Sequence, residues 1–132
     1  KMYQNDLIKM AGGRSVSEDL EDGYWATISA EQLLAWNPQY IYSVGYASYG
    51  LESFLEDSKF EGLDAVENGN VYSFPSIIEP WDYPTPSSIM GLSWLVSQLH
   101  PELYSIEQYT EEATMFYETF FGIEVDADDM GL

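Results

Sequence analysis

Two short runs of β-branched and aromatic residues constrain the fold of this 132-residue chain more than any other feature. Residues 39–44 and 70–74 have the composition and length of β-strands, and residues 49–57 and 63–67 between them have helical patterns. Strands joined through helices pair in parallel. The alternation predicts an α/β domain, a three-layer sandwich in which helices cover both faces of a small, mainly parallel sheet. Two strands are too few for such a sheet, so we expect further strands, unrecognised here or encoded upstream of Lys1.

Capping motifs delimit two of the helices. Ser29-Ala-Glu-Gln32 has the pattern of a capping box, and the helix that it opens is expected to stop before Pro38. Ser105-Ile-Glu-Gln108 opens a second helix, which is expected to cover residues 106–121 and to end at Gly122.

The rest of the chain adds helices near both ends. Residues 3–11 and 87–99 have helical periodicity. Residues 126–132 are acidic and lack the downstream glutamate of a calcium loop, so we expect a disordered tail. Residues 1–125 are then expected to form a single domain.

The charge of the chain excludes several partners. Four basic residues oppose 23 acidic ones, for a net charge of −19, whereas nucleic acids and anionic membranes are bound through Lys and Arg. The chain has no cysteine, which excludes disulfides and thiolate metal sites. A solvated acidic surface is the simplest interpretation of the charge.

Catalytic motifs are weak. The single histidine, His100, follows a predicted helix, where histidines commonly bond the last carbonyls. Gly91-Leu-Ser-Trp-Leu95 lacks the second glycine of a nucleophile elbow, and no phosphate-binding loop or dinucleotide fingerprint occurs. We predict that the chain is not an enzyme and holds neither a cofactor nor a metal.

Aromatic residues suggest a binding site. Trp25 and Trp81 lie in loops that lead into helices, at the sheet edge where open α/β folds bind ligands. A tryptophan there offers a flat apolar face and one N–H donor to a ring-bearing ligand, although either ring could equally fold onto the core. Tyr46 and Tyr49 follow the first strand and are either further ligand contacts or surface tyrosines.

Eight short motifs follow one another along nearly the whole chain. They are Asn5-Asp-Leu-Ile-x-x-Ala-Gly-Gly13, Trp25-x-x-Ile-Ser-x-Glu-Gln-Leu-Leu34, Asn37-Pro-x-Tyr-Ile41, Gly62-Leu-x-Ala-Val-x-Asn-Gly-x-Val-Tyr72, Trp81-Asp-x-Pro-x-Pro86, Leu92-x-Trp-Leu95, Leu99-His-Pro-Glu-Leu103 and Phe116-Tyr117 with Phe121-Gly122. In this order and spacing the chain resembles the cobalamin, siderophore and haem binding proteins of ABC importers.

The resemblance implies a carrier with two α/β lobes, joined by a long helix, that hold the ligand between them. The motifs belong to the C-terminal lobe, so the N-terminal lobe, the linking helix and the first strand of this lobe are absent from the sequence. The implied partners are an iron-siderophore, haem or corrinoid, the permease subunits and the N-terminal lobe. The implied location is extracytoplasmic, either in the periplasm or on a membrane-anchored lipoprotein.

The resemblance also assigns roles to residues. Trp25 corresponds to a position that lines the cleft, and Trp81 and Asp82 lie in a loop that commonly approaches the ligand. Glu31 corresponds to a carboxylate that pairs with arginines of the permease, although by itself it has the pattern of an ordinary first-turn glutamate. Tyr83 stands near the place where many relatives carry an arginine, which favours a neutral or amphipathic macrocycle, or a ligand whose charge is met by the other lobe.

Two other classes of function stay open at this point. Exposed aromatic side chains also serve glycan-binding and adhesion domains, although such domains are commonly rich in paired strands. A carboxylate-based hydrolase would require two acidic side chains that face each other in a pocket.

Overall fold

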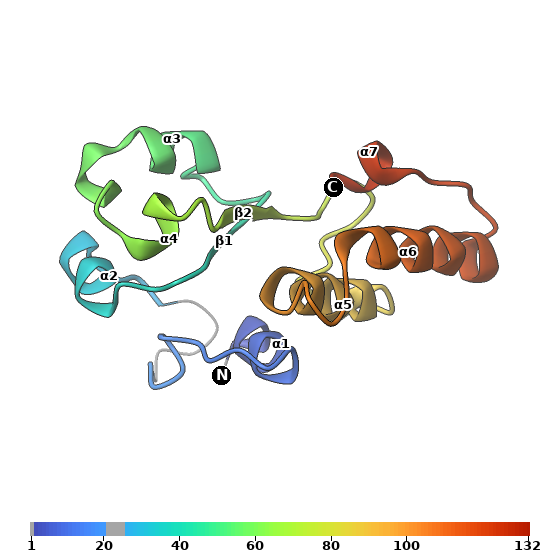
Figure 1. Cartoon of the computed structure of the whole chain (residues 1–132), viewed down its shortest axis with the longest axis horizontal. Helices are drawn as coiled ribbons and strands as arrows, with labels where there is room; N and C mark the ends of the chain where they lie inside the picture. Colours follow the sequence, from blue (N-terminus) through green and yellow to red (C-terminus); the bar gives the residue numbers. More distant parts are fainter. Residues whose placement is uncertain (1, 21–25) are drawn as a thin grey trace.

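The computed structural model describes residues 2–20 and 26–132 and shows a mixed α/β fold (Figure 1). The predicted α/β class is therefore confirmed. The elements in chain order are α1 (Tyr3–Met10), α2 (Ala30–Trp36), β1 (Ile41–Val44), α3 (Leu51–Glu56), the 3-10 helix η1 (Ser58–Phe60), α4 (Asp64–Glu67), β2 (Val71–Phe74), α5 (Ser88–Leu99), α6 (Ile106–Phe121) and α7 (Ala127–Met130).

The sheet lies near the middle of the molecule, between two groups of helices. Within the described residues it has two strands, β1 and β2, which pair in parallel with Ile41 opposite Val71 and Val44 opposite Phe74. Helices α2, α3 and α4 lie at one end of the molecule, and α5, α6 and α7 lie toward the other (Figure 1). The predicted parallel pairing is confirmed, because the chain returns from β1 to β2 through α3, η1 and α4.

Trp94 of α5 packs the helix against the sheet. Its ring lies 5.6 Å from that of Tyr42 on β1 and 4.8 Å from that of Phe74 on β2, in edge-on contacts. Tyr72 completes the group with an edge-on contact at 6.4 Å. Side chains two residues apart on a strand share one face, so this face of the sheet is the one that α5 covers.

Trp81 anchors the Pro-rich loop to α6. Its indole Nε1 donates a hydrogen bond of 2.6 Å to the hydroxyl of Tyr117, and its ring stacks on that of Tyr117 and meets Tyr109 edge-on. Gly91 lets α5 approach the same loop, because a Cβ at that position would lie 2.5 Å from the carbonyl oxygen of Trp81. The loop is therefore held by both long helices.

The predicted helix boundaries agree well with the structure. Ser29 Oγ accepts a hydrogen bond of 3.2 Å from the backbone N–H of Gln32, and α2 ends at Asn37 in a left-handed conformation. At α6 both hydrogen bonds of the capping box between Ser105 and Gln108 are present, and Gly122 provides the left-handed C-terminal residue.

The prediction of a disordered C-terminal tail is wrong. Residues 127–130 form α7, where Asp126 and Asp129 make a reciprocal capping box. Met130 is 1% exposed in the core, and Leu132 packs against that core. Burial of these apolar side chains holds the acidic segment against the domain.

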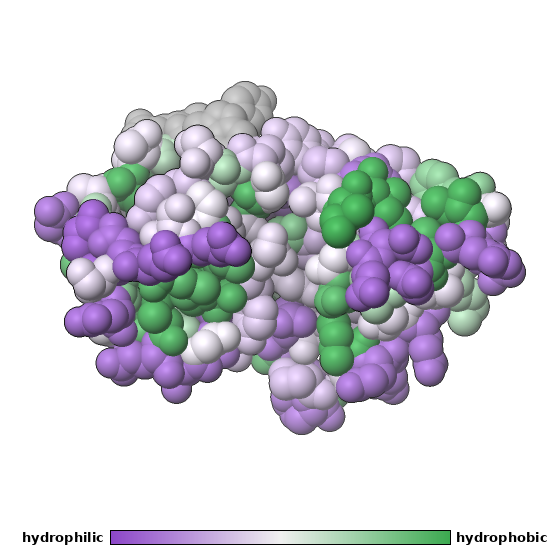
Figure 2. Space-filling view, turned by 90° about the horizontal axis from the view of Figure 1, so that it is seen from above, coloured by the Kyte–Doolittle hydropathy of each residue, from purple (hydrophilic) through white to green (hydrophobic). Residues whose placement is uncertain are grey.

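The surface combines charge with apolar patches. Hydrophobic side chains gather at both ends of the face seen in Figure 2, and hydrophilic side chains border them. No helix among the described residues combines the length and the apolar character that crossing a bilayer requires.

Replacement of Tyr117 by Phe should destabilise the fold by about 1–3 kcal/mol, because it leaves the buried N–H of Trp81 without an acceptor. Urea unfolding followed by fluorescence measures the loss. Tyr104→Phe is the matched control, since its hydroxyl donates to Glu112 at the surface and its removal should change stability by less than about 0.5 kcal/mol. Equal effects of the two substitutions would contradict the anchoring role of Trp81.

Candidate functional site

Two loops meet at the carboxyl edge of the sheet. Residue Gly45 follows β1 directly, and the Pro-rich loop follows β2 at Pro75. Because the strands are parallel, both loops leave the sheet on the same side, the side on which open α/β folds place their ligands. The contact is close: a Cβ at Gly45 would collide with the hydroxyl of Ser76.

Asp82 lies at the centre of this edge and is 1% exposed. Its Oδ2 accepts hydrogen bonds from the hydroxyl of Tyr46 and, at 3.0 Å, from Nε2 of Gln4 on α1. Nε2 of Gln4 also lies 3.3 Å from the backbone carbonyl oxygen of Asp82. Among the described residues, none donates to the buried Oδ1. One carboxylate thus joins α1, the loop after β1 and the Pro-rich loop.

Tyr46 and Tyr83 form the exposed surface beside Asp82. Their ring centroids lie 5.4 Å apart in an edge-on contact, and each residue is 41% exposed. Burial, and then the hydrogen bond and negative charge of Asp82, raise the pKa of the Tyr46 phenol well above its ordinary value. We call Tyr46, Asp82 and Tyr83 together the tyrosine–aspartate wall.

The other predicted ligand residues do not join this wall. The hydroxyl of Tyr49 lies 3.2 Å from Oδ2 of Asp57 and 3.2 Å from the carbonyl oxygen of Ser53, so this side chain associates with α3. Trp81, proposed as a ligand contact with a ring folded onto the core as the equal alternative, is 1% exposed and stacks on Tyr117, so its ring belongs to the core. Trp25 lies outside the described residues.

A groove of about 760 Å³ begins at Asp82 and follows β1. Its lining is mainly apolar and includes Trp36 of α2, Tyr42 of β1 and Leu95 of α5. His100 also contributes, with its Nε2 lying 3.1 Å from the carbonyl oxygen of Ala11 at the end of α1. The sequence placed His100 at a helix end correctly, but the helix end that it bonds belongs to α1.

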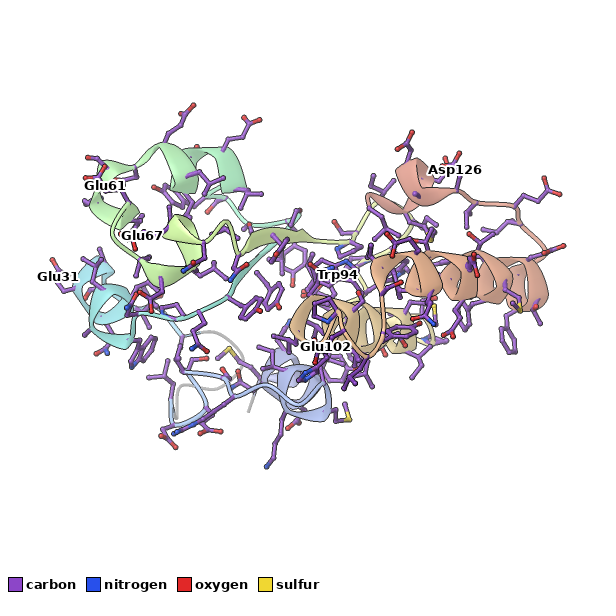
Figure 3. All side chains as sticks on the ribbon, in the orientation of Figure 1. Glu31, Glu61, Glu67, Trp94, Glu102 and Asp126 are labelled. Atoms are coloured by element: carbon purple, nitrogen blue, oxygen red, sulfur yellow. The ribbon has the colours of Figure 1, made fainter. Side chains whose placement is uncertain are left out.

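Glu31 lies apart from the wall, in the exposed first turn of α2. Hydrogen bonds from its own backbone N–H and from the Ser29 hydroxyl, together with the charge of Lys59, lower the pKa of its carboxyl group. Glu31, Glu61 and Glu67 lie toward the same end of the molecule, opposite Asp126 (Figure 3).

No three histidine, aspartate or glutamate side chains converge on a possible metal ion within residues 2–20 and 26–132. The polar groups of the wall are one carboxylate and two phenol hydroxyls, and the rings of the two tyrosines provide aromatic faces beside them. This arrangement suits the binding of a molecule by stacking and hydrogen bonding.

Comparison with protein families identifies the family of the chain. A family model described as periplasmic binding protein matches residues 2–78, which is more than half of the chain. The chain belongs to this periplasmic binding protein family. The resemblance drawn from the motifs is confirmed, and so is the prediction that the chain is not an enzyme, because the family is one of binding proteins.

Individual periplasmic binding proteins resemble the chain over almost its whole length. The periplasmic solute binding protein of Veillonella parvula superposes with a TM-score of 0.81 at 23% identity, covering 96% of this chain and 40% of its own. An ABC transporter solute binding protein of Sulfurospirillum deleyianum gives a TM-score of 0.78 at 27% identity, with coverages of 96% and 39%.

The molybdate-binding protein MolA of Haemophilus influenzae is a further relative. It is 23% identical over 128 residues, which are 96% of this chain and 36% of MolA. Its molybdate-bound structure superposes with a TM-score of 0.80 at 22% identity, with coverages of 94% and 38%. This periplasmic binding protein chain thus spans about two fifths of the length of the relatives that it matches.

Asp82→Asn should lower the pKa of the Tyr46 phenol, because an amide keeps the shape of the side chain but removes its negative charge. The pKa should stay above the ordinary value, since burial is the larger cause of the shift. Alkaline absorbance titration measures the change, with Tyr46→Phe used to subtract the other tyrosines. Glu112→Gln, which alters the acceptor of Tyr104, should leave the Tyr46 signal unchanged. An unaltered Tyr46 titration in Asp82→Asn would contradict the assigned hydrogen bond.

Proposed function

We propose that this chain is one lobe of an extracytoplasmic solute-binding protein that delivers its ligand to an ABC importer. The observation that carries the proposal is the tyrosine–aspartate wall at the carboxyl edge of the parallel sheet. Family membership and the likeness to a solute binding protein of an ABC transporter support it. The protein acts as a carrier, either free in the periplasm or anchored to the membrane as a lipoprotein.

The proposed lobe is a three-layer sandwich formed mainly by residues 1–125, with residues 126–132 packed against it. Helix α5 lies on one face of the sheet through Trp94, and α3 contacts β2. Within the described residues β1 pairs along one edge only, and the 760 Å³ groove follows that strand. A further strand of the full-length protein against β1 would complete the sheet.

The proposed ligand is an iron-siderophore, haem or corrinoid held between this lobe and an N-terminal one. Large chelates and macrocycles offer flat or apolar surfaces, and the half-exposed rings of Tyr46 and Tyr83 suit contact with them. Trp25 stays a proposed neighbour of the ligand. Trp81 supports the wall from inside, because its ring is buried directly before Asp82 in the chain.

Isothermal titration of the full-length protein tests the proposed ligand class. The titrants are cyanocobalamin, haem, ferrichrome and molybdate. Dissociation constants of about 1 µM or below for one of the first three would support the proposal. Binding to none of the four, with folding verified by circular dichroism, would contradict it and favour glycans as the next candidates.

Glu31 is proposed to dock the lobe on the permease. Its carboxylate is exposed, carries a lowered pKa and begins a helix, so it can accept a bidentate contact from an arginine. Glu61 and Glu67 at the same end of the molecule extend the negative surface (Figure 3). A positively charged patch on the permease would complement this end.

Glu31→Ala should reduce ligand uptake by about tenfold, because loss of a charge-assisted contact weakens docking. Ligand affinity of the full-length protein should stay unchanged. Uptake in reconstituted vesicles and titration calorimetry measure the two quantities. Glu102→Ala is the control, since it removes an exposed carboxylate from the connection between α5 and α6. Equal losses of uptake and affinity in Glu31→Ala would rule out a docking role.

A further inference from the structure

Asp82 is a negative group that the described part of the chain leaves without a basic partner. The described basic side chains are Lys9, Arg14 and Lys59. Arg14 pairs with Glu18 at 2.9 Å and is 82% exposed, and Lys59 pairs with Asp57 at 2.9 Å. Lys9 is exposed in the last turn of α1, and no ion pair found among the described residues includes Asp82. The carboxylate therefore depends on hydrogen bonds alone.

Those hydrogen bonds use only half of the carboxylate. Both side-chain donors, from Tyr46 and Gln4, meet Oδ2, whereas Oδ1 receives none within the described part of the chain. A carboxylate buried in this way keeps much of its field, because little solvent lies around it to screen the charge. Asp82 also lines the groove, so this field acts on whatever approaches the edge of the sheet.

Tyr46, like the Asp82 carboxylate, disfavours a negatively charged ligand. A phenol has a single proton, and Tyr46 donates it inward to Asp82. The Tyr46 hydroxyl then has no proton left for a ligand, and the ligand meets the half-exposed aromatic ring of Tyr46. Oxyanions are recognised through several N–H or O–H donors, whereas aromatic faces and acceptor oxygens suit cations and groups that donate hydrogen bonds.

We infer that Asp82 determines the charge class of the ligand, and that the tyrosine–aspartate wall selects neutral or cationic chelates and macrocycles over oxyanions and anionic chelates. The inference rests on the proposed function and narrows it. It also separates this chain from MolA, whose structure holds molybdate, an oxyanion. Asp82 acts here through its charge and through the orientation that it imposes on Tyr46.

Titration of the full-length protein with ligands of one class and different charge tests the inference. The siderophore series is cationic ferrioxamine B, neutral ferrichrome and anionic ferric enterobactin, and the corrinoid pair is cationic aquacobalamin and neutral cyanocobalamin. Molybdate is the oxyanion probe. The wild type should bind the cationic or neutral member at least roughly tenfold more tightly than the anionic one, because like charges at close range oppose binding.

Substitution of Asp82 by Asn separates charge from shape. Asp82→Asn should reduce the discrimination against anionic members by roughly tenfold, since it keeps an acceptor for Tyr46 but removes the charge. Glu118→Gln removes the same charge from an exposed position on α6 and should leave the discrimination unchanged. Tyr46→Phe keeps the Asp82 charge, so this variant should retain most of the discrimination against anionic members.

The outcomes distinguish this inference from the proposed function. Binding of no probe in either series would overturn the proposed function, and the inference with it. Tight binding of ferric enterobactin or molybdate, unaffected by Asp82→Asn, would overturn the charge selection and leave the carrier function standing. Should Asp82→Asn fail to fold, the wild-type ranking decides: a preference for the anionic member overturns the inference, and a preference for the cationic or neutral members supports it.

Discussion

Burial of Trp81 is the interaction on which the arrangement of the candidate site depends. The indole donates a hydrogen bond to Tyr117, and the backbone of Trp81 lies against α5 at Gly91. A buried tryptophan of this kind typically contributes about 3–5 kcal/mol relative to alanine. The next residue in the chain is Asp82, so the position of the carboxylate follows from the packing of its neighbour. Backbone hydrogen bonds within the Pro-rich loop, such as that from Tyr83 N–H to the Pro80 carbonyl, shape it locally, and the contacts of Trp81 with α5 and α6 fix its position on the domain.

The sequence predicted those parts of the fold that local chemistry determines. Ser105 and Gln108 sit three residues apart, and their reciprocal hydrogen bonds depend on little beyond that spacing. The parallel pairing of β1 with β2 follows from the helical connection between them. Trp94 lies in a regular helix, where periodicity assigns it to the packed face.

Features that depend on distant partners could not be predicted in the same way. The acceptor of Trp81 lies 36 residues further along the chain, and Gln4 reaches Asp82 across 78 residues. Nothing near Trp81 in the sequence indicates whether its ring faces outward or inward. The C-terminal segment was misjudged for another reason: its acidic residues suggested solvent, whereas Asp126 caps a helix and Met130 completes the core.

The electrostatic effect of a carboxylate in this chain depends on whether it is exposed or buried. Glu31 and most other carboxylates are exposed to water, where solvent weakens their individual effects. Asp82 is a single carboxylate in a buried position, and its field is far less screened. One buried group can therefore influence recognition more than the large net charge of −19 does.

The edge of β1 that has no partner strand among the described residues affects how such a protein folds. Among the described residues, β1 offers one row of backbone donors and acceptors beside an apolar groove. An edge of this kind recruits any extended segment that reaches it, including the same edge of another copy. In the proposed full-length protein, the strand that completes the sheet must therefore pair with β1 before a second molecule does. Folding of the proposed lobe is then a kinetic competition between intramolecular strand pairing and self-association. A high local concentration of incompletely folded chains would favour self-association.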